Sequence, residues 1–164
     1  MNKTPQKLQQ LGDLLVDMES VVVAYSGGVD SAFLAAVARR SLGDRCLAVT
    51  ASSPSLPPGE LEAATELAKR LGLRHRVIET REVEEPDYAA NGPRRCYFCK
   101  SHLYRHFQAL AKEKGYAHVV DGATLDDNME FRPGATAARE WGVRSPLVEI
   151  GFTKKELREF SREM

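Results

Sequence analysis

Short apolar runs alternate with amphipathic segments along the chain, and this alternation predicts strands separated by helices. Continuous apolar runs are typical of strands buried on both faces, and we expect strands over residues 21–25, 46–50, 76–80, 118–121 and 146–148. Apolar residues at helical spacing predict helices over residues 4–18, 31–42, 59–71, 101–114, 136–141 and from 153 onward. This order predicts an α/β fold with a doubly wound, mainly parallel sheet of about five strands.

The regular alternation stops at residue 82 and resumes near residue 101. Residues 82–100 contain proline, glycine and acidic side chains but few apolar ones, which predicts an exposed loop. This loop carries a Cys-x-x-Cys pair, Cys96 and Cys99. Because loops often hold binding and catalytic groups, the segment is a candidate functional region.

Composition narrows the class of protein. The chain has 164 residues, 43% hydrophobic and 28% charged, which fits one globular domain. Its 23 Lys and Arg balance its 23 Asp and Glu, so we do not expect a nucleic-acid partner. No apolar run is long enough to span a bilayer and no secretory signal is recognisable, so we expect a cytoplasmic protein without a membrane partner. We also expect a homo-oligomer.

A glycine-rich sequence, Ser-Gly-Gly-Val-Asp-Ser, lies at residues 26–31 between a predicted buried strand and a predicted helix. Two adjacent glycines allow a tight turn that brings backbone N–H groups to a ligand, and the helix presents its positive end. These features predict a phosphate-binding loop. Asp30 would repel bound phosphates unless a cation intervened, so we expect it to hold Mg²⁺. The alternative is a glycine-rich turn in which Asp and Ser cap the helix.

This loop resembles the pyrophosphate loop of the N-type ATP pyrophosphatases, or PP-loop enzymes, which include NAD, GMP and asparagine synthetases and several thiolation enzymes. The resemblance implies a fold of the adenine nucleotide alpha hydrolase (HUP) type and adenylation of a substrate with release of pyrophosphate. It makes Asp30 and Lys154 the catalytic candidates, although Lys154 is alternatively an exposed lysine at a helix end. The residues that it implies for ATP binding are Ser26, Gly27, Gly28, Val29, Asp30, Ser31, Ala51, Ser52 and Lys154.

A second candidate segment, residues 121–128, follows the fourth predicted strand, at the sheet edge where open α/β folds bind ligands. Carboxylates there can reach the metal of a nucleotide, so we predict Asp121 and Asp126 as further Mg²⁺ ligands. For Asp126, capping of a helix is the alternative. We also place Gly122 at the ATP phosphates.

Residues 121–128, 131–134, 139–147 and 95–100 together resemble the LarE family of ATP-dependent sulfur transferases, over nearly the whole chain. The resemblance implies adenylation of a carboxylate of a pyridinium dicarboxylate mononucleotide, followed by sulfur transfer that gives a thiocarboxylate. We expect Arg132 and Arg144 to contact this substrate. Family chains are longer, and the apolar stripe of the last helix runs to Met164 without a cap. We therefore expect residues 1–164 to be the PP-loop ATP-binding domain in the N-terminal part of a longer protein.

The loop cysteines leave three interpretations open. One branch of the LarE family carries sulfur on a [4Fe–4S] cluster held by three cysteines, which makes Cys96 and Cys99 candidate cluster ligands, with the third cysteine expected beyond Met164 in the full-length protein. These cysteines with His102 and His106 form an alternative zinc set, and free thiols are the third interpretation. Cys46 begins a predicted buried strand and is expected in the core.

The sequence thus predicts an ATP- and Mg²⁺-dependent adenylating sulfurtransferase whose partners are ATP and a small nucleotide-like substrate. One alternative is another PP-loop adenylating enzyme, such as a tRNA thiolase or an ammonia-using synthetase of the NAD or GMP type. The other alternative is a nucleotide-binding module without catalysis.

Overall fold

The computed structural model describes residues 4–52, 57–80, 95–128 and 133–163, with only the backbone described at 4, 95–100, 127–128, 133–136 and 163. Four parallel strands of this part form one sheet: β1 (Val21–Ala24), β2 (Cys46–Ser52), β3 (His75–Glu79) and β4 (His118–Val120). Their order across the sheet is β3-β2-β1-β4. The predicted parallel α/β architecture is therefore confirmed.

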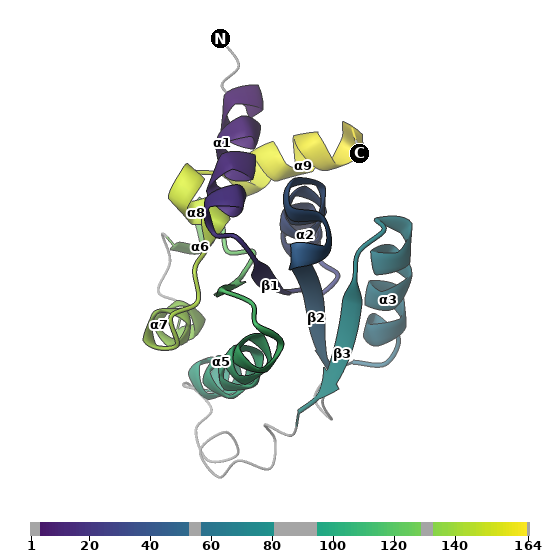
Figure 1. Cartoon of the computed structure of the whole chain (residues 1–164), viewed down its shortest axis with the longest axis vertical. Coiled ribbons are helices and arrows are strands. Elements are labelled where there is room, and N and C mark those ends of the chain that lie inside the picture. The colour runs from purple at the N-terminus through teal and green to yellow at the C-terminus, as the bar shows by residue number, and fades with distance from the viewer. Residues whose placement is uncertain (1–3, 53–56, 81–94, 129–132, 164) are drawn as a thin grey trace.

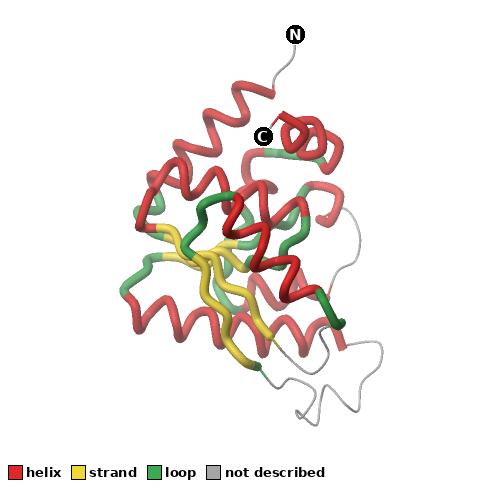
Figure 2. Tube along the Cα trace, turned by 90° about the vertical axis from the view of Figure 1, so that its right-hand side faces the viewer, coloured by secondary structure: helices red, strands yellow, loops and turns green. Residues whose placement is uncertain are grey.

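Helices cover both faces of the sheet, as Figures 1 and 2 show. One face packs against α1 (Thr4–Asp17), α2 (Val29–Leu42), α3 (Glu60–Arg70) and α9 (Lys154–Glu163). The other face packs against α5 (Arg95–Lys114) and α7 (Pro133–Glu140). The short turns are η1 (Gly43–Arg45), α6 (Leu125–Asn128) and α8 (Pro146–Ile150). The fold is thus doubly wound.

The apolar run of β1 is continuous because its residues supply two cores. Val21 and Val23 belong to the cluster that includes α1 and α2, whereas Val22 belongs to the cluster that includes Phe107 of α5. All three valines are 0% exposed. Side chains alternate between the faces of a strand, so a strand covered on both faces needs apolar residues throughout.

Two predicted elements differ from the structure. Residues 146–148, predicted as a fifth strand, begin helix α8, because proline suits the first helical position and Gly151 ends the helix with a φ of 99°. Beyond β4, the described residues add only an isolated parallel bridge between Val120 and Arg144. Residues 95–100, predicted as part of the loop, form the first turns of α5, and residues 81–94 lie outside the described part.

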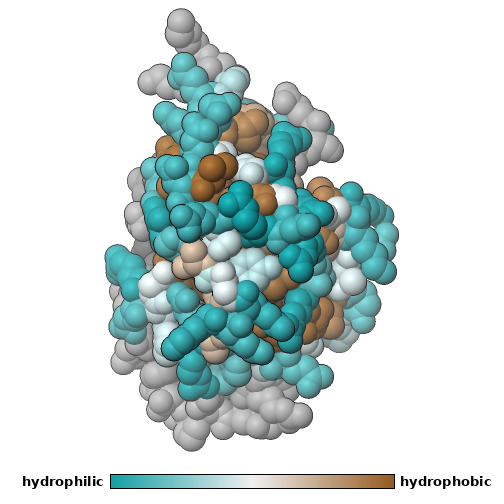
Figure 3. Space-filling model, viewed as in Figure 1, coloured by the Kyte–Doolittle hydropathy of each residue, from teal (hydrophilic) through white to brown (hydrophobic). Residues whose placement is uncertain are grey.

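None of the helices in the described part of the chain is long and apolar enough to cross a membrane. The face drawn in Figure 3 is mostly hydrophilic, and its apolar side chains gather in small separate groups. Large continuous apolar patches mark interaction surfaces, so this face does not suggest one among the described residues.

Glu19, just after α1, is exposed and has a φ of 72°. Because a side chain in this left-handed conformation costs roughly 1 kcal/mol and glycine avoids the cost, Glu19→Gly should raise the free energy of unfolding by about 0.5–1 kcal/mol. Urea denaturation measures this change. Gln10→Gly, at an exposed position inside α1, is the control and should lower the same free energy by about 1 kcal/mol. Destabilisation by both changes would contradict the assignment of strain to Glu19.

Candidate nucleotide-binding site

The candidate site lies where the strand order reverses, between β1 and β4. The chain runs outward from β1 through β2 to β3, and α5 then returns it to β4 on the other side of β1. Ligands of open α/β sheets bind outside the carboxyl ends of the strands at such a point. Two segments begin there: the phosphate loop (residues 26–31) after β1, and the β4 loop (residues 121–124).

Hydrogen bonds within the phosphate loop fix its shape. The Oγ of Ser31 accepts a bond from the N–H of Ser26 at 3.1 Å and lies 3.1 Å from the Oγ of Ser26. The N–H of Gly28 donates to the Oγ of Ser26 at 3.3 Å. Helix α2 begins directly after Gly28, a glycine that has no side chain to cap the helix. The first N–H groups of α2, with their partial positive charge, are therefore suited to an anion.

Two glycines allow backbones to approach the phosphate loop closely. Gly27 has a φ of 86°, and a Cβ added there would lie 2.9 Å from the Cβ of Ala64 in α3. A Cβ added to Gly122 would lie 2.9 Å from the backbone nitrogen of Ser31. Cβ atoms essentially never come so close to other atoms, so no side chain fits at either position. Helix α3 and the β4 loop thus both pack directly against the phosphate loop.

Asp121 holds the β4 loop in place. Its Oδ1 accepts hydrogen bonds from the Oγ of Ser145 at 2.7 Å and the N–H of Ala123 at 3.2 Å. Its Oδ2 accepts a bond from the hydroxyl of Tyr104 at 3.1 Å. The carboxylate predicted as a Mg²⁺ ligand therefore has three donors of its own and positions Gly122, while its role toward Mg²⁺ stays a prediction.

The backbone of Ala51 faces the site from the end of β2. The carbonyl oxygen of Ser52 accepts a bond from the N–H of Thr80, on the β3 side, at 2.8 Å. Alternate residues of an inner parallel strand bond to opposite neighbours, so Ala51 directs its N–H and C=O toward β1. Because β1 ends at Ala24, opposite Val49, these groups lie beside the phosphate loop, which agrees with the place of Ala51 among the residues implied for ATP binding.

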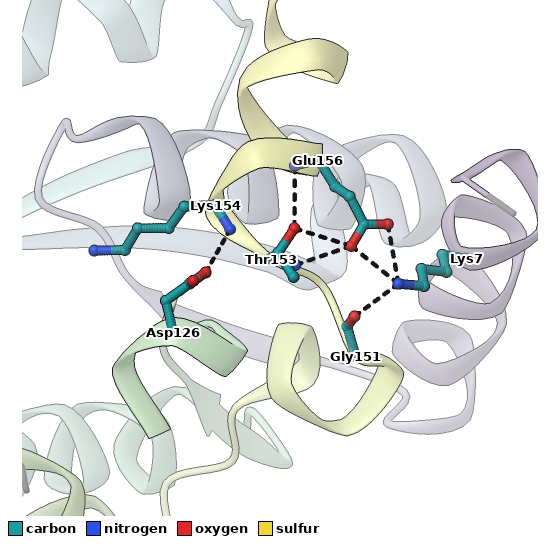
Figure 4. A network of polar contacts seen from close by, with 6 residues as sticks. All are labelled: Lys7, Asp126, Gly151, Thr153, Lys154 and Glu156. Atoms are coloured by element: carbon teal, nitrogen blue, oxygen red, sulfur yellow. Dashed lines mark hydrogen bonds and ion pairs between the residues drawn. The ribbon is translucent and has the colours of Figure 1, made fainter. Parts of the chain in front are cut away.

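Two carboxylates fix the start of α9 (Figure 4). The Oδ2 of Asp126 accepts a bond from the backbone N–H of Lys154 at 2.7 Å. The Oε1 of Glu156 accepts from the N–H of Thr153 at 3.1 Å, and the N–H of Glu156 donates to the Oγ1 of Thr153 at 3.3 Å, so the two residues form a capping box. Asp126 thus caps α9, which is the alternative that the sequence analysis gave for it. Its role as a Mg²⁺ ligand stays a prediction. The side chain of Lys154 extends away from this network in Figure 4.

Lys7 of α1 ties the N-terminal helix to the same network. Its Nζ donates to the two carboxylate oxygens of Glu156 at 3.0 and 2.9 Å, and to the carbonyl of Gly151 at 2.8 Å. Burial acts to raise the pKa of Glu156, but the hydrogen bonds from Lys7 and Thr153 outweigh it and hold that pKa below its ordinary value. The charge of Glu156 therefore stabilises the start of α9.

These segments line one cleft of about 870 Å³, within the range typical of small-molecule sites. The structure thereby brings together most of the predicted site residues: Ser26, Gly28, Val29, Asp30, Ser31, Ala51, Asp121, Gly122, Arg144 and Lys154. Of the other described candidates, Gly27, Ser52 and Asp126 do not line the cleft. Arg132 lies outside the described residues.

The cleft also has lining residues that the sequence reasoning missed. Charged examples are Glu60, Arg139, Glu149 and Arg158, and an apolar wall is formed by Leu103, Phe107, Ala138 and Val143. Arg158 could have been found, because it follows Lys154 by one helical turn and such residues share a helix face. Arg139 had no such signal, since its place depends on how α7 packs against α5.

Arg144 lies in the cleft wall, but its guanidinium is paired. Its Nε and Nη2 donate to the carboxylate of Glu149 at 3.1 and 2.6 Å, and both side chains are 37% exposed. The hydrogen bond to Glu149 raises the pKa of Arg144 above its ordinary value. An anionic substrate would therefore share or replace Glu149 at this arginine.

The cysteines do not form a complete cluster site. Cys46 is 2% exposed in the core, as predicted, and burial raises the pKa of its thiol to about 12. The chain has three cysteines, so only Cys96 and Cys99 remain for a cluster that needs three. Within this chain Cys96 and Cys99 would supply two of the three ligands, and a cluster in the full-length protein stays a prediction.

The zinc set stays a prediction. His102 and His106 lie with ring centroids 4.7 Å apart on α5, but the side chains of Cys96 and Cys99 are outside the described part. Among the side chains that are described, no group of three or more His, Cys, Asp or Glu is arranged to hold a metal.

Gly27→Ala should destabilise the protein strongly, because the new Cβ meets Ala64 and the residue keeps a left-handed backbone. We expect the free energy of unfolding in urea to fall by about 2–4 kcal/mol. Gly28→Ala is the matched control, since its Cβ would have only an ordinary 3.5 Å contact with Ser26, and should cost at most about 1 kcal/mol. Equal losses would show that the contact with Ala64 is not tight.

Lys7→Met should lower the free energy of unfolding at neutral pH by about 1 kcal/mol, since the ion pair is only partly buried, with side chains 24% and 20% exposed. The depressed pKa of Glu156 contributes stability above its unfolded value of 4.5, and this stability is lost as the pH falls through the folded pKa. The difference between variant and wild type should therefore shrink in acid. Lys155→Met, at an exposed position of α9, is the control and should match wild type; a difference that persists in acid would contradict this assignment.

Known proteins give independent information on this chain. The NAD synthase family model matches residues 9–91, half of the chain. A protein of Synechocystis named slr1717 is 46% identical over 95% of this chain and 58% of its own length. Pyridinium-3,5-bisthiocarboxylic acid mononucleotide synthase of Lactiplantibacillus plantarum is 33% identical over 92% of this chain and 55% of its own length. The chain thus spans somewhat more than half the length of these curated relatives.

Solved structures share the fold at low sequence identity. NMN synthetase of Francisella tularensis superposes with a TM-score of 0.75 at 20% identity, over 99% of this chain and 71% of that one. The U34-tRNA thiolase of Methanococcus maripaludis, solved with its [4Fe–4S] cluster, gives a TM-score of 0.71 at 16% identity, over 98% of this chain and 62% of that one. From the family match, the phosphate loop and this fold, we conclude that the chain belongs to the NAD synthase family of PP-loop ATP-using enzymes.

Proposed function

We propose that the chain binds ATP with Mg²⁺ in the cleft and adenylates a carboxylate of a pyridinium dicarboxylate mononucleotide, as the activating half of a sulfur-transfer reaction. The observation that carries the proposal is the convergence of the phosphate loop, Gly122 and Lys154 on one cleft. These groups come from three separate parts of the chain. The similarity to pyridinium-3,5-bisthiocarboxylic acid mononucleotide synthase supports the choice of acceptor.

The phosphate loop binds the β- and γ-phosphates in this proposal. The N–H groups at the start of α2 and the hydroxyls of Ser26 and Ser31 supply the donors. Lys154 lines the same cleft from α9 and supplies a positive charge that stabilises the pyrophosphate as it leaves. Asp30, in the first turn of α2, and Asp121 are the carboxylates that would hold Mg²⁺, which neutralises phosphate charge when bound.

The adenosine lies between the end of β2 and the start of α3. Ala51 offers backbone groups on the β1 side, while Glu60 and Leu61 line the cleft nearby. The backbone can recognise an adenine edge without a particular side chain, which accounts for the weak sequence signal there.

The adenylation step requires only that ATP and the acceptor meet in the cleft. An acceptor carboxylate oxygen attacks the α-phosphorus of ATP, the new O–P bond forms as the bond to the bridging oxygen of the β-phosphate breaks, and pyrophosphate leaves. The acyl adenylate then has AMP as a good leaving group, and a sulfur nucleophile displaces it to give a thiocarboxylate. No residue of the described part is assigned as the sulfur donor.

The acceptor occupies the side of the cleft formed by α5, α7 and α8. Leu103 and Phe107 offer an apolar wall for a pyridinium ring, and Arg144 and Arg139 offer positive charge to its carboxylates and phosphate. Arg132, outside the described residues, stays a proposed contact. Because the reaction consumes ATP and a soluble mononucleotide, we also place the protein in the cytoplasm.

The test is pyrophosphate release from ATP and Mg²⁺ by this chain, with and without the pyridinium dicarboxylate mononucleotide. We expect release only with the acceptor, and a rate at least about tenfold lower for Lys154→Met, because transition-state charge stabilisation is lost. Lys155→Met is the matched control, an exposed neighbour outside the cleft lining, and should leave the rate unchanged.

Other outcomes would favour the alternatives. Pyrophosphate release that requires ammonia or tRNA in place of the mononucleotide would favour another adenylating enzyme of the superfamily. Tight ATP binding without cleavage under every condition would favour a binding module. Absence of ATP binding would contradict the proposal at its first step.

A further inference from the structure

Tyr25 occupies the position between β1 and the phosphate loop, and its side chain is directed at α3. The hydroxyl donates a hydrogen bond to the carbonyl oxygen of Ala64 at 2.8 Å, and the residue is only 2% exposed. Tyr25 belongs to the core cluster that also contains Ala64 and Ala68 of α3. One buried side chain therefore joins the start of the phosphate loop to the second turn of α3.

The same residue of α3 meets the loop at a second point. Gly27 lies so close to Ala64 that an added Cβ would be 2.9 Å from the Cβ of Ala64 and 3.0 Å from its Cα. The hydrogen bond holds the carbonyl oxygen of Ala64, and the close contact with Gly27 involves its Cβ and Cα. Two residues of the segment 25–27, Tyr25 and Gly27, thus hold the phosphate loop against the helix.

Polar contacts hold the backbone of Tyr25 from the sheet side. The hydroxyl of Thr50 donates to the carbonyl of Tyr25 at 2.9 Å, and the Oγ1 of Thr50 lies 2.7 Å from the Nε2 of His75. The rings of Tyr25 and His75 meet edge to face with centroids 5.4 Å apart. The sheet therefore holds Tyr25 independently of α3. Because Tyr25 is held in this way, its bond to Ala64 restricts the position of α3 relative to the loop.

Helix α3 also reaches the cleft. Glu60 and Leu61, in its first turn, line the cleft on the side proposed for adenosine, whereas the phosphate loop lines the side proposed for phosphates. A displacement of α3 would move both contacts with the loop. The spacing between the two ends of the nucleotide site depends on how firmly α3 is joined to the loop.

We infer that the Tyr25–Ala64 hydrogen bond is a latch that positions the phosphate loop against α3, so that binding of phosphates rigidifies α3 at the nucleoside end of the cleft. Tyr25 is among the residues that line the cleft, but its hydroxyl bonds to Ala64, so we assign it as a positioning residue. The inference rests on the proposed phosphate site and adds a residue, and a coupling, that the proposed function does not require.

Tyr25→Phe isolates the latch, because it removes one oxygen and leaves the ring. The Ala64 carbonyl keeps the intrahelical bond that α-helix geometry provides, so no buried acceptor is orphaned. Calorimetry should show Mg²⁺–pyrophosphate binding weakened by about three- to tenfold, because the free loop of the variant occupies its binding position for a smaller fraction of the time, and adenosine binding unchanged. Tyr116→Phe is the matched control: its hydroxyl accepts a bond from Arg74 at 3.4 Å, and Tyr116 does not line the cleft.

Amide hydrogen exchange separates positioning from general stability. In wild type, Mg²⁺–pyrophosphate should slow exchange at residues 60–70, whereas in Tyr25→Phe this slowing should be lost although the variant still binds adenosine. Equal pyrophosphate affinity and equal protection of residues 60–70 in both proteins would overturn the latch and leave the phosphate site standing. Failure of wild type to bind Mg²⁺–pyrophosphate would overturn the phosphate site itself.

Discussion

Close backbone packing around residues 26–31 is the constraint on which the rest of the site depends. Gly27 brings the loop against α3, and Gly122 brings the β4 loop against Ser31, with less than the width of a methyl group to spare at either place. The two contacts restrict where the loop backbone can lie. In this position the N-terminus of α2 is directed at the cleft. Asp121, bonded to three donors, holds the second of these contacts in register.

The remaining charge of the site comes from a distant part of the chain. Lys154 reaches the cleft because Asp126, Glu156 and Lys7 fix the start of α9 against α6, α8 and α1. These three side chains do not line the cleft, and their contribution is to hold a helix end. The site is therefore assembled by helix capping and ion pairing at its periphery as much as by the residues that would touch a nucleotide.

The sequence was sufficient for the parts of the fold that local patterns determine. Periodicity located the four strands, and the glycine-rich loop was recognisable because its close packing needs glycine at 27 and its internal hydrogen bonds need Ser26 and Ser31. The prediction of a fifth strand was wrong because Pro146-Leu147-Val148 is too short for periodicity to separate a strand from a helical turn. Helix α6 was not predicted because its four residues have no apolar repeat. Tertiary packing determines the features that the sequence did not reveal, because no local pattern encodes it. These features are the place of Arg139 in the cleft, the Arg144–Glu149 ion pair and the hydrogen bond from Ser145 to Asp121.

In the proposed function, Mg²⁺-ATP binds across the phosphate loop, the β4 loop and the start of α9. Titration of ¹⁵N-labelled protein with Mg²⁺-ATP, followed through backbone amide shifts, tests it most directly. We expect the largest shifts at residues 26–31, at Gly122 and at Lys154, with saturation at a single affinity. Saturating shifts confined to other residues, or no shifts at millimolar nucleotide, would contradict it.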